Sequence, residues 1–101
     1  MKTFLVTGAA NGIGRAVVLA LAERGDLAVL NDLTDSAALT SLVRQLEQAG
    51  VESRVVLGDV SAPETARQAF DGLPRLDVLV NNAGILNESP ITEMSFEQWD
   101  N

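Results

Sequence analysis

The sequence predicts an α/β fold: a doubly wound parallel sheet with helices on both of its faces. Four short apolar runs, typical of buried strands, alternate with three segments whose apolar residues recur at helical spacing. Each connection is long enough for a helical crossover, which makes neighbouring strands parallel. Clusters of glycine and polar residues follow directly after the apolar runs. Ligands bind to such sheets at the carboxyl ends of the strands, so a site is expected in these clusters.

The first expected strand, residues 4–6, leads through a glycine-rich turn into the first expected helix. The turn, residues 7–14, reads Thr-Gly-Ala-Ala-Asn-Gly-Ile-Gly. The apolar residues that predict the buried face of the helix are Ile13, Ala16, Val17, Ala20 and Leu21. The helix is expected to end at residues 23–25, with Gly25 as its left-handed C-terminal residue.

This turn has the features of a phosphate site. Glycine allows positive φ and a close approach to the backbone. The first amides of a helix have no partner within it and carry partial positive charge, which a pyrophosphate would satisfy. The alternative is a tight turn without a ligand. Asp32 favours the phosphate site, because it ends the next apolar run eighteen residues after Gly14. A dinucleotide-binding fold places its ribose-binding carboxylate at about this distance.

The middle of the chain continues the alternation. A second strand is expected at residues 27–30, followed by Asn31 and Asp32. The second helix begins after one of three possible N-caps and stops at Gly50; the N-cap candidates are Thr34, Asp35 and Ser36. A third strand is expected at residues 53–57, followed by a turn at residues 58–60.

The last expected elements are a helix, a strand and the start of another helix. Ser61 and Glu64 predict a capping box, and the helix they begin ends at Gly72. The fourth strand, residues 76–80, is followed by Asn-Asn-Ala-Gly. After a loop at residues 85–92, residues 94–99 carry signals for a helix start with barely one turn to follow. So short a helix is unstable alone, and we predict a fragment whose sheet is truncated after its fourth strand.

The polar residues at the expected strand ends suit an adenosine ligand. The Asp32 carboxylate could accept from both ribose hydroxyls, or be a solvated acid or helix cap. Asp59 could accept from the adenine amine while Val60 packs on the ring, or be an ordinary turn aspartate. Asn81 and Asn82 offer donors and acceptors to a ligand or to neighbouring strands. Arg15 either reaches a phosphate or is a solvated helix residue.

These motifs together resemble the short-chain dehydrogenase/reductase family. Residues 7–14 match its Thr-Gly-x3-Gly-x-Gly cofactor loop, residues 59–60 its adenine contact, and residues 81–84 its Asn-Asn-Ala-Gly signature. The resemblance runs from Lys2 to the end and implies that residues 1–101 are the N-terminal part of one Rossmann-like NAD(P)-binding domain. It places at the pyrophosphate Gly8, Asn11, Gly12, Ile13 and Gly14. It places at the nicotinamide-side ribose Asn82, Ala83 and Gly84.

The resemblance also implies hydride transfer between a nicotinamide cofactor and an alcohol or ketone, in a protein that is usually a homodimer or homotetramer. The family's catalytic tyrosine is absent, since the chain contains no tyrosine, and the single lysine, Lys2, precedes the first strand. No catalytic residue is therefore assigned here. Asp32 predicts NAD rather than NADP, because a 2′-phosphate would meet its negative charge. Two alternatives stay open: a non-catalytic nucleotide-binding or regulatory module, and, less supported, a methyltransferase-like Rossmann domain.

Length and composition exclude several other classes of function. The 101 residues are 47% hydrophobic, enough for the core of one small domain. Without cysteine or histidine, disulfides, thiolate or imidazole metal sites and His-dependent triads are excluded within this sequence. The net charge of −7 argues against nucleic acid as a partner. No apolar run approaches the ~20 residues of a membrane helix, and no room is left for a signal peptide, so a cytoplasmic protein is expected.

Overall fold

The computed structural model describes residues 1–82, which form a four-stranded sheet and its helices. The elements follow one another as β1 (Thr3–Thr7), α1 (Gly12–Leu21), β2 (Leu27–Asp32), α2 (Ala37–Gln48), β3 (Glu52–Leu57), α3 (Pro63–Phe70) and β4 (Val78–Val80). All pairings are parallel, in the order β3-β2-β1-β4. The predicted order of elements and the parallel sheet are confirmed.

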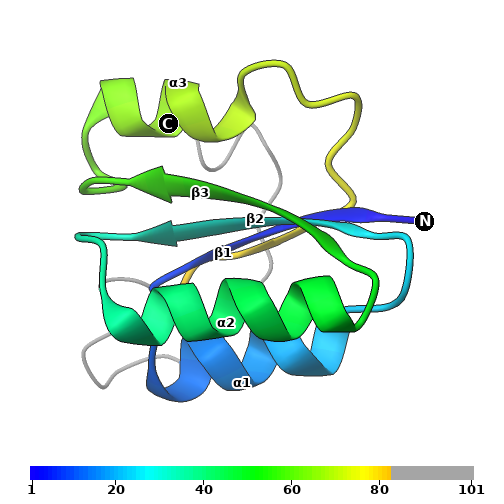
Figure 1. Cartoon of the computed structure of the whole chain (residues 1–101). Helices are drawn as coiled ribbons and strands as arrows, with labels where there is room; N and C mark the ends of the chain where they lie inside the picture. The colour runs from blue at the N-terminus through cyan, green and yellow to red at the C-terminus, as the bar shows by residue number, and fades with distance from the viewer. Residues whose placement is uncertain (83–101) are drawn as a thin grey trace.

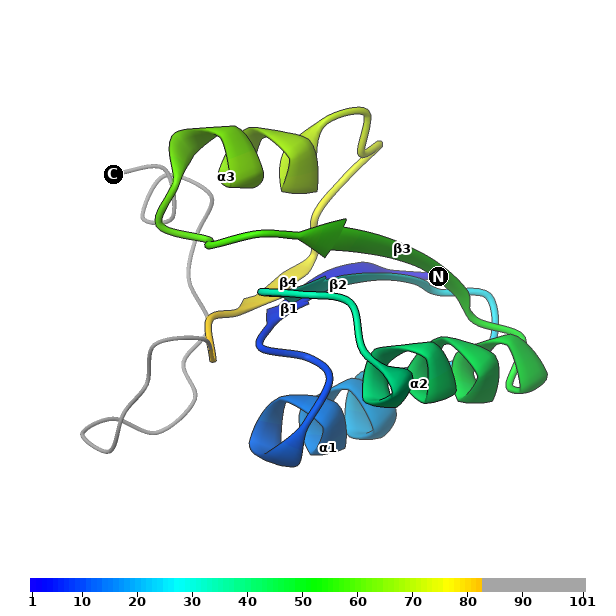
Figure 2. The same ribbon diagram turned by 60° about the vertical axis from the view of Figure 1, so that its left-hand side comes forward.

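Helices cover both faces of the sheet, and each face has its own apolar core. α1 and α2 lie together on one face and α3 lies on the other (Figure 1), and the turned view in Figure 2 separates the three layers. The larger core, on the face of α1 and α2, includes Phe4, Leu30 and Leu42. The smaller core, under α3, includes Val29 and Ala69. The sheet is therefore doubly wound, as the sequence predicts.

The continuous apolar character of β1 and β2 follows from their central position. β1 is buried along its whole length and β2 along its four inner residues, because each is covered on both faces. β3 lies at one edge of the sheet, and its Val55 and Leu57 are 41% and 42% exposed. The two buried strands hold the loops that follow them in fixed positions.

The buried face of α1 is only partly the predicted one, since Val17 and Leu21 pack against the larger core but the other predicted residues do not. Ile13 is 61% exposed and Ala16 and Ala20 are exposed, whereas Gly14 and Val18 are buried. The reason is the close approach of α1 to β1 at Gly14, where a side chain would collide with the Gly8 carbonyl. This approach turns a different stripe of the helix toward the sheet.

The end of α1 also differs from the prediction. The helix stops at Leu21, and Ala22 is already extended. The Asp26 carboxylate accepts a hydrogen bond from the Glu23 amide and so holds the turn that follows. Gly25 has a positive φ of 92°, as predicted, but in this turn rather than at the helix end.

The start of α2 selects one of its three candidate caps. Ser36 is the N-cap, and its hydroxyl accepts from the Leu39 amide at 3.1 Å. Asp35 instead accepts from the Ser36 amide, and α2 ends just before Gly50, whose φ is 79°. The prediction of a helix stop at Gly50 is confirmed.

Two further predictions, the capping box of α3 and the length of β4, are wrong. The N-cap of α3 is Ala62, and the Ser61 hydroxyl donates to Asp59 instead of capping the helix. β4 is limited to Val78–Val80, and Asp77, directly before it, binds β1 with its side chain, since its carboxylate accepts from the Thr3 amide. The predicted loop at residues 85–92 and the helix start at residues 94–99 lie outside the described residues.

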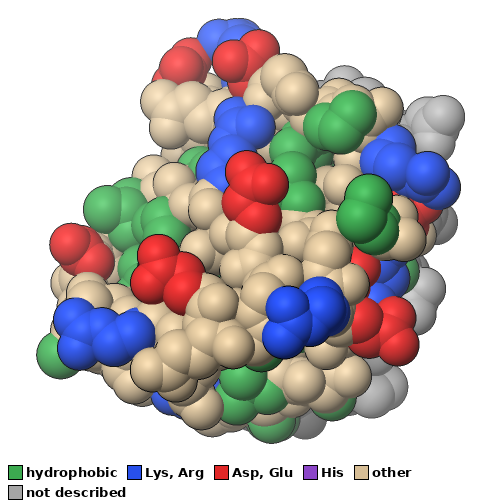
Figure 3. Space-filling view, turned by 45° about the vertical axis from the view of Figure 1, so that its right-hand side comes forward, with side chains coloured by type: hydrophobic (Ala, Val, Ile, Leu, Met, Phe, Trp, Pro, Cys, Tyr) green, Lys and Arg blue, Asp and Glu red, His purple; other side chains and the backbone are tan. Residues whose placement is uncertain are grey.

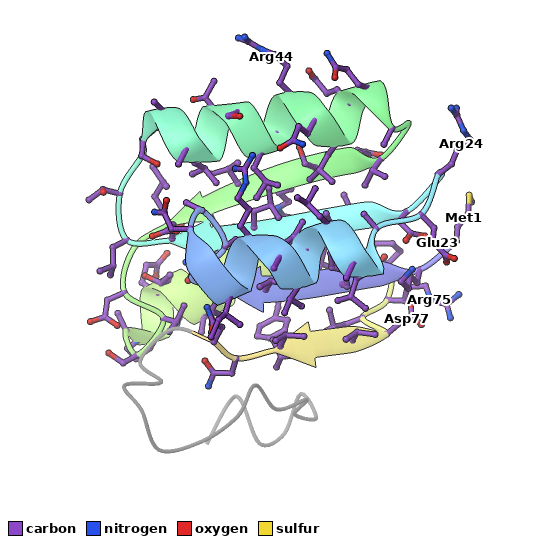
Figure 4. All side chains as sticks on the ribbon, turned by 90° about the horizontal axis from the view of Figure 1, so that it is seen from below. Met1, Glu23, Arg24, Arg44, Arg75 and Asp77 are labelled. Atoms are coloured by element: carbon purple, nitrogen blue, oxygen red, sulfur yellow. The ribbon has the colours of Figure 1, made fainter. Side chains whose placement is uncertain are left out.

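Charged residues gather at the amino ends of the strands. Figure 4 shows Met1, Glu23, Arg24, Arg75 and Asp77 at this end of the molecule. On the face shown in Figure 3, acidic and basic side chains are interspersed, so this face presents no large area of single sign.

Asp26 also lies at the amino ends of the strands, and it is buried. The backbone amide and the ammonium group of Lys2 both donate hydrogen bonds to its carboxylate. Lys2 Nζ lies 2.7 Å from Asp26 Oδ2, and the Asp26 side chain is 2% exposed. Burial alone would raise the pKa of the Asp26 carboxyl, but hydrogen bonds from Lys2 and the Glu23 amide outweigh it and lower this pKa to about 2. The same hydrogen bond raises the pKa of Lys2. This pair joins the start of β1 to the turn before β2.

Candidate functional site

The carboxyl ends of the four strands meet at one edge of the sheet. The register pairs Thr7 with Asn31, Asp32 with Leu57, and Val6 with Val80. The loop after each strand therefore emerges at the same edge, at the arrow tips of Figure 1. The parallel topology brings together residues that are up to 75 positions apart in the chain.

The three glycines of the turn after β1 meet different requirements. Gly8 and Gly12 have φ values of 64° and 57°, in the region that favours glycine. A Cβ at Gly14 would lie 1.9 Å from the Gly8 carbonyl oxygen and 2.8 Å from Asn82 Nδ2. Gly8 and Gly12 thus permit the backbone conformation of the turn, and Gly14 lets α1 pack closely against it.

The first amides of α1 face the same edge without a side-chain cap. Asn11 is the N-cap, in an extended conformation, and its side chain accepts no capping hydrogen bond within the described part of the chain. Asn11, Gly12 and Ile13 are exposed. Uncapped amides at a helix start can donate to an anion, so this end of α1 can receive a phosphate.

The Asp32 carboxylate lies directly against the glycine-rich turn. Its Oδ2 accepts from the Ala10 amide at 2.8 Å, and its Oδ1 accepts from the Leu33 amide at 2.8 Å. Each carboxylate oxygen has further lone pairs, and the side chain is half-buried, so it can still accept from a ligand hydroxyl. Asp32 therefore connects the turn after β1 with the turn after β2.

The turn after β3 is shaped by Asp59. Its Oδ1 accepts from both the amide and the hydroxyl of Ser61, at 2.9 and 2.8 Å, and these bonds lower the pKa of the Asp59 carboxyl. Asp59 is exposed and Val60 is half-buried at the same edge. The contacts are those of a turn aspartate, and its second oxygen has no bond to another described residue that would prevent it from meeting a ligand.

Asn81 and Asn82 join β4 to the turn after β1. The Thr7 hydroxyl donates to Asn81 Oδ1 at 3.1 Å and accepts from the Asn82 amide at 2.8 Å. Asn82 Nδ2 donates to the Gly8 carbonyl at 3.3 Å. Both asparagines therefore make the contacts to neighbouring strands that the sequence offered as the alternative to ligand binding. Ala83 and Gly84 lie outside the described residues.

Arg15 points to α2 rather than to the edge of the sheet. Its guanidinium donates to the Ala38 carbonyl at 3.0 Å and to the Ser41 and Gln45 side chains. Neither expectation for Arg15 is therefore correct: it neither reaches the glycine-rich turn nor is simply solvated, but joins α1 to α2.

Asn31 is a buried polar residue at this edge that the sequence did not single out. It was expected to follow the second strand, but it is part of β2 and only 2% exposed. The alternation of side chains along a strand gave the available signal, since Asn31 lies on the same face as buried Val29.

The geometry matches a known family. The family model described as short chain dehydrogenase matches residues 2–101. This chain belongs to that family. A short-chain dehydrogenase/reductase from Hericium erinaceus is 41% identical over 103 residues, which cover 95% of this chain and 41% of the relative.

Solved structures of other dehydrogenases and reductases have the same Rossmann-like fold. A 3-oxoacyl-[acyl-carrier protein] reductase from Brucella melitensis with bound NAD superposes with a TM-score of 0.69 at 35% identity. The match covers 87% of this chain and 34% of the reductase. An L-sorbose reductase from Gluconobacter frateurii complexed with NADPH superposes with a TM-score of 0.65 at 33% identity. This match covers 98% of this chain and 39% of the L-sorbose reductase. The chain thus spans well under half the length of these relatives.

Among residues 1–82, no helix is both long and apolar enough to cross a membrane. The same residues contain no group of three or more acidic, histidine or cysteine side chains arranged to hold a metal ion.

Proposed function

We propose that this chain is the cofactor-binding part of an NAD-dependent oxidoreductase that interconverts an alcohol and the corresponding ketone. The observation that carries the proposal is the Asp32 carboxylate at the end of β2, in contact with the glycine-rich turn. In this proposal the pyrophosphate lies on the turn and the start of α1, at Gly8, Asn11, Gly12, Ile13 and Gly14. Asp32 binds the adenosine ribose, and Asp59 and Val60 meet the adenine. Asn82, Ala83 and Gly84 line the nicotinamide-side ribose.

The choice of NAD over NADP rests on charge. A 2′-phosphate on the ribose would remove a hydroxyl donor and bring a second negative charge to Asp32. At about 4 Å and an effective dielectric of about 20, such a pair costs about 4 kcal/mol before screening. The nearest positions that could offset it hold Ala10, Asn11 and Leu33, and Arg15 is bonded to α2. The site therefore favours a free ribose hydroxyl.

A comparison of the two reduced cofactors tests this proposal in the complete protein. We expect kcat/KM with NADH to exceed that with NADPH by about 100-fold, because a hydroxyl bonded to a carboxylate contributes ~1.5–3 kcal/mol and the phosphate is repelled. Asp32→Ala should remove most of this preference. Asp35→Ala is the matched control, since within residues 1–82 this exposed carboxylate accepts only from the Ser36 amide in the same loop. A preference for NADPH, or unchanged discrimination in Asp32→Ala, would overturn the assignment to NAD.

A second prediction concerns residues 1–101 alone, which we expect to have no dehydrogenase activity. The chain contains no tyrosine, and Lys2 is bonded to Asp26 at the opposite end of β1 from the glycine-rich turn. A missing acid–base group costs ~10²–10⁴-fold in rate. The purified chain is assayed with NADH and a panel of ketones beside the complete protein. Comparable turnover would refute the proposal that the catalytic groups lie outside this chain.

The rest of the protein distinguishes an enzyme from a non-catalytic nucleotide-binding module. A Tyr-x3-Lys element beyond residue 101 supports the oxidoreductase, and its absence supports the module. We further propose a small alcohol or ketone as substrate, a homodimer or homotetramer as the complete assembly, and a cytoplasmic location.

A further inference from the structure

Asn31 connects three segments that lie at the carboxyl edge of the sheet. Its backbone carbonyl accepts from the Ala9 amide, in the glycine-rich turn, at 2.9 Å. Its side-chain Nδ2 donates to the Val56 carbonyl at 2.9 Å and to the Gly58 carbonyl at 3.2 Å. The next residue is Asp32, whose carbonyl accepts from the Gly58 amide at 2.9 Å. One residue thus contacts the end of β3 and the glycine-rich turn, and directly precedes Asp32.

The burial of Asn31 gives these bonds their importance. The residue is 2% exposed, on the face of β2 that packs under α3. Burying a polar side chain lowers the stability of the fold unless its polar groups form hydrogen bonds. The carboxamide nitrogen carries two hydrogens, one for each of two carbonyls. The Val56 carbonyl belongs to β3, and the Gly58 carbonyl belongs to the turn that follows β3. An apolar side chain of similar size would leave both carbonyls without these donors.

We infer that Asn31 is a positioning residue for the adenosine half of the cofactor. It holds the turn that carries Asp59 and Val60 in one position relative to the Asp32 carboxylate and the glycine-rich turn. The ribose and adenine contacts are then in place before the cofactor arrives. This inference rests on the proposed function, since it assigns Asn31 to the same site.

The arrangement predicts an effect on one half of the cofactor only. The nicotinamide end lies toward Asn82, and no hydrogen bond of Asn31 reaches the asparagines after β4. If the turn after β3 is in its binding conformation for only a tenth of the time, the dissociation constant for adenosine ligands rises tenfold. The chemical step at the nicotinamide is unaffected once the cofactor is bound.

The test uses Asn31→Leu in the complete protein, which removes both donors and keeps the same number of side-chain heavy atoms with the same branching. We expect the KM for NADH and the inhibition constant of 5′-AMP to rise together, by about 10-fold, with kcat within about twofold of the original. Asn31→Ser keeps one hydroxyl donor in less space and should give a smaller rise of the same two constants. It decides the question if Asn31→Leu does not fold.

Val29→Ala is the matched control, since Val29 lies on the same strand and face and is fully buried. Its apolar side chain has no hydrogen-bond donor for the Val56 and Gly58 carbonyls. It should lower the melting temperature without changing the inhibition constant of 5′-AMP. An unchanged 5′-AMP constant in Asn31→Ser and Asn31→Leu, or a loss confined to kcat, overturns the inference alone. Failure of the unmodified protein to bind NADH or 5′-AMP overturns the proposed function as well.

Discussion

Replacing Gly14 with alanine is expected to cost about 3 kcal/mol of folding free energy in the complete protein and to abolish measurable cofactor binding. The added Cβ would lie 1.9 Å from the Gly8 carbonyl oxygen, far inside van der Waals contact. The obstacle is backbone, which cannot rotate away as a flexible side chain can. Overpacking of this kind typically costs ~1–3 kcal/mol, and more where nothing can yield. Relief requires that α1 or the glycine-rich turn shift, and both belong to the proposed pyrophosphate site.

The measurement is the melting temperature together with NADH binding, and the expected fall in melting temperature is about 10 °C. Gly72→Ala is the control: its φ is 72° but a Cβ there meets nothing within 4 Å, so only the left-handed backbone is penalised, at ~1–2 kcal/mol. Equal effects of the two substitutions on stability and binding would contradict the role given to the close approach at Gly14.

Asp26→Ala is expected to destabilise the complete protein by about 2–3 kcal/mol, because hydrogen-bond donors at a position that is 2% exposed lose their charged acceptor. The Asp26 carboxylate accepts from the Lys2 amide, the Lys2 ammonium and the Glu23 amide, and its removal leaves all three without this acceptor. Denaturant unfolding measures the loss. Glu64→Ala is the control, because Glu64 pairs with Arg67 on the surface with both side chains well over half exposed, and should cost ~0.5 kcal/mol or less.

The pH dependence of unfolding gives a second test of Asp26. Its pKa is about 2 in the folded protein and 3.8 in its ordinary state. The folded pKa is the lower one, so the carboxylate stabilises the fold above about pH 4, by about 2 kcal/mol, and this contribution is lost as the pH falls toward 2. Asp26→Asn should therefore be less stable above pH 4 and should approach the unmodified protein near pH 2. Parallel stability curves for the two proteins would refute this assignment.

The elements that could be predicted from the sequence are those with local signals. The apolar runs that became β1 and β2 needed only neighbouring residues, and so did the set of three candidate caps that includes Ser36 and the helix stop at Gly50. The family signature likewise consists of short contiguous motifs. For this reason the parallel sheet and the edge that carries the candidate site could be predicted without coordinates.

The mistaken predictions depend on partners distant in the sequence or on competition between neighbours. The buried stripe of α1 is set by Gly14, which has no side chain to signal burial. Ser61 was expected to cap α3, but Asp59, two residues earlier, binds its hydroxyl. Asp26 is buried by a contact to Lys2, 24 residues away, which no local pattern reveals. For Asn31 the strand alternation signals a buried position, but the partners of its carboxamide lie 25 and 27 residues away in the sequence.

The two partners of the hydrogen bond between Thr7 and the Asn82 amide are made at different times during synthesis. The two residues are 75 positions apart, so β1 and its glycine-rich turn leave the ribosome long before β4 does. At about 5–20 residues per second, roughly 4 to 15 s separate them. β1 can pair with β2 in that interval, but its other side stays open until Val78–Val80 arrives. In the proposed cofactor assignment, the nascent chain therefore acquires the residues for the adenosine half first and Asn82, on the nicotinamide side, last.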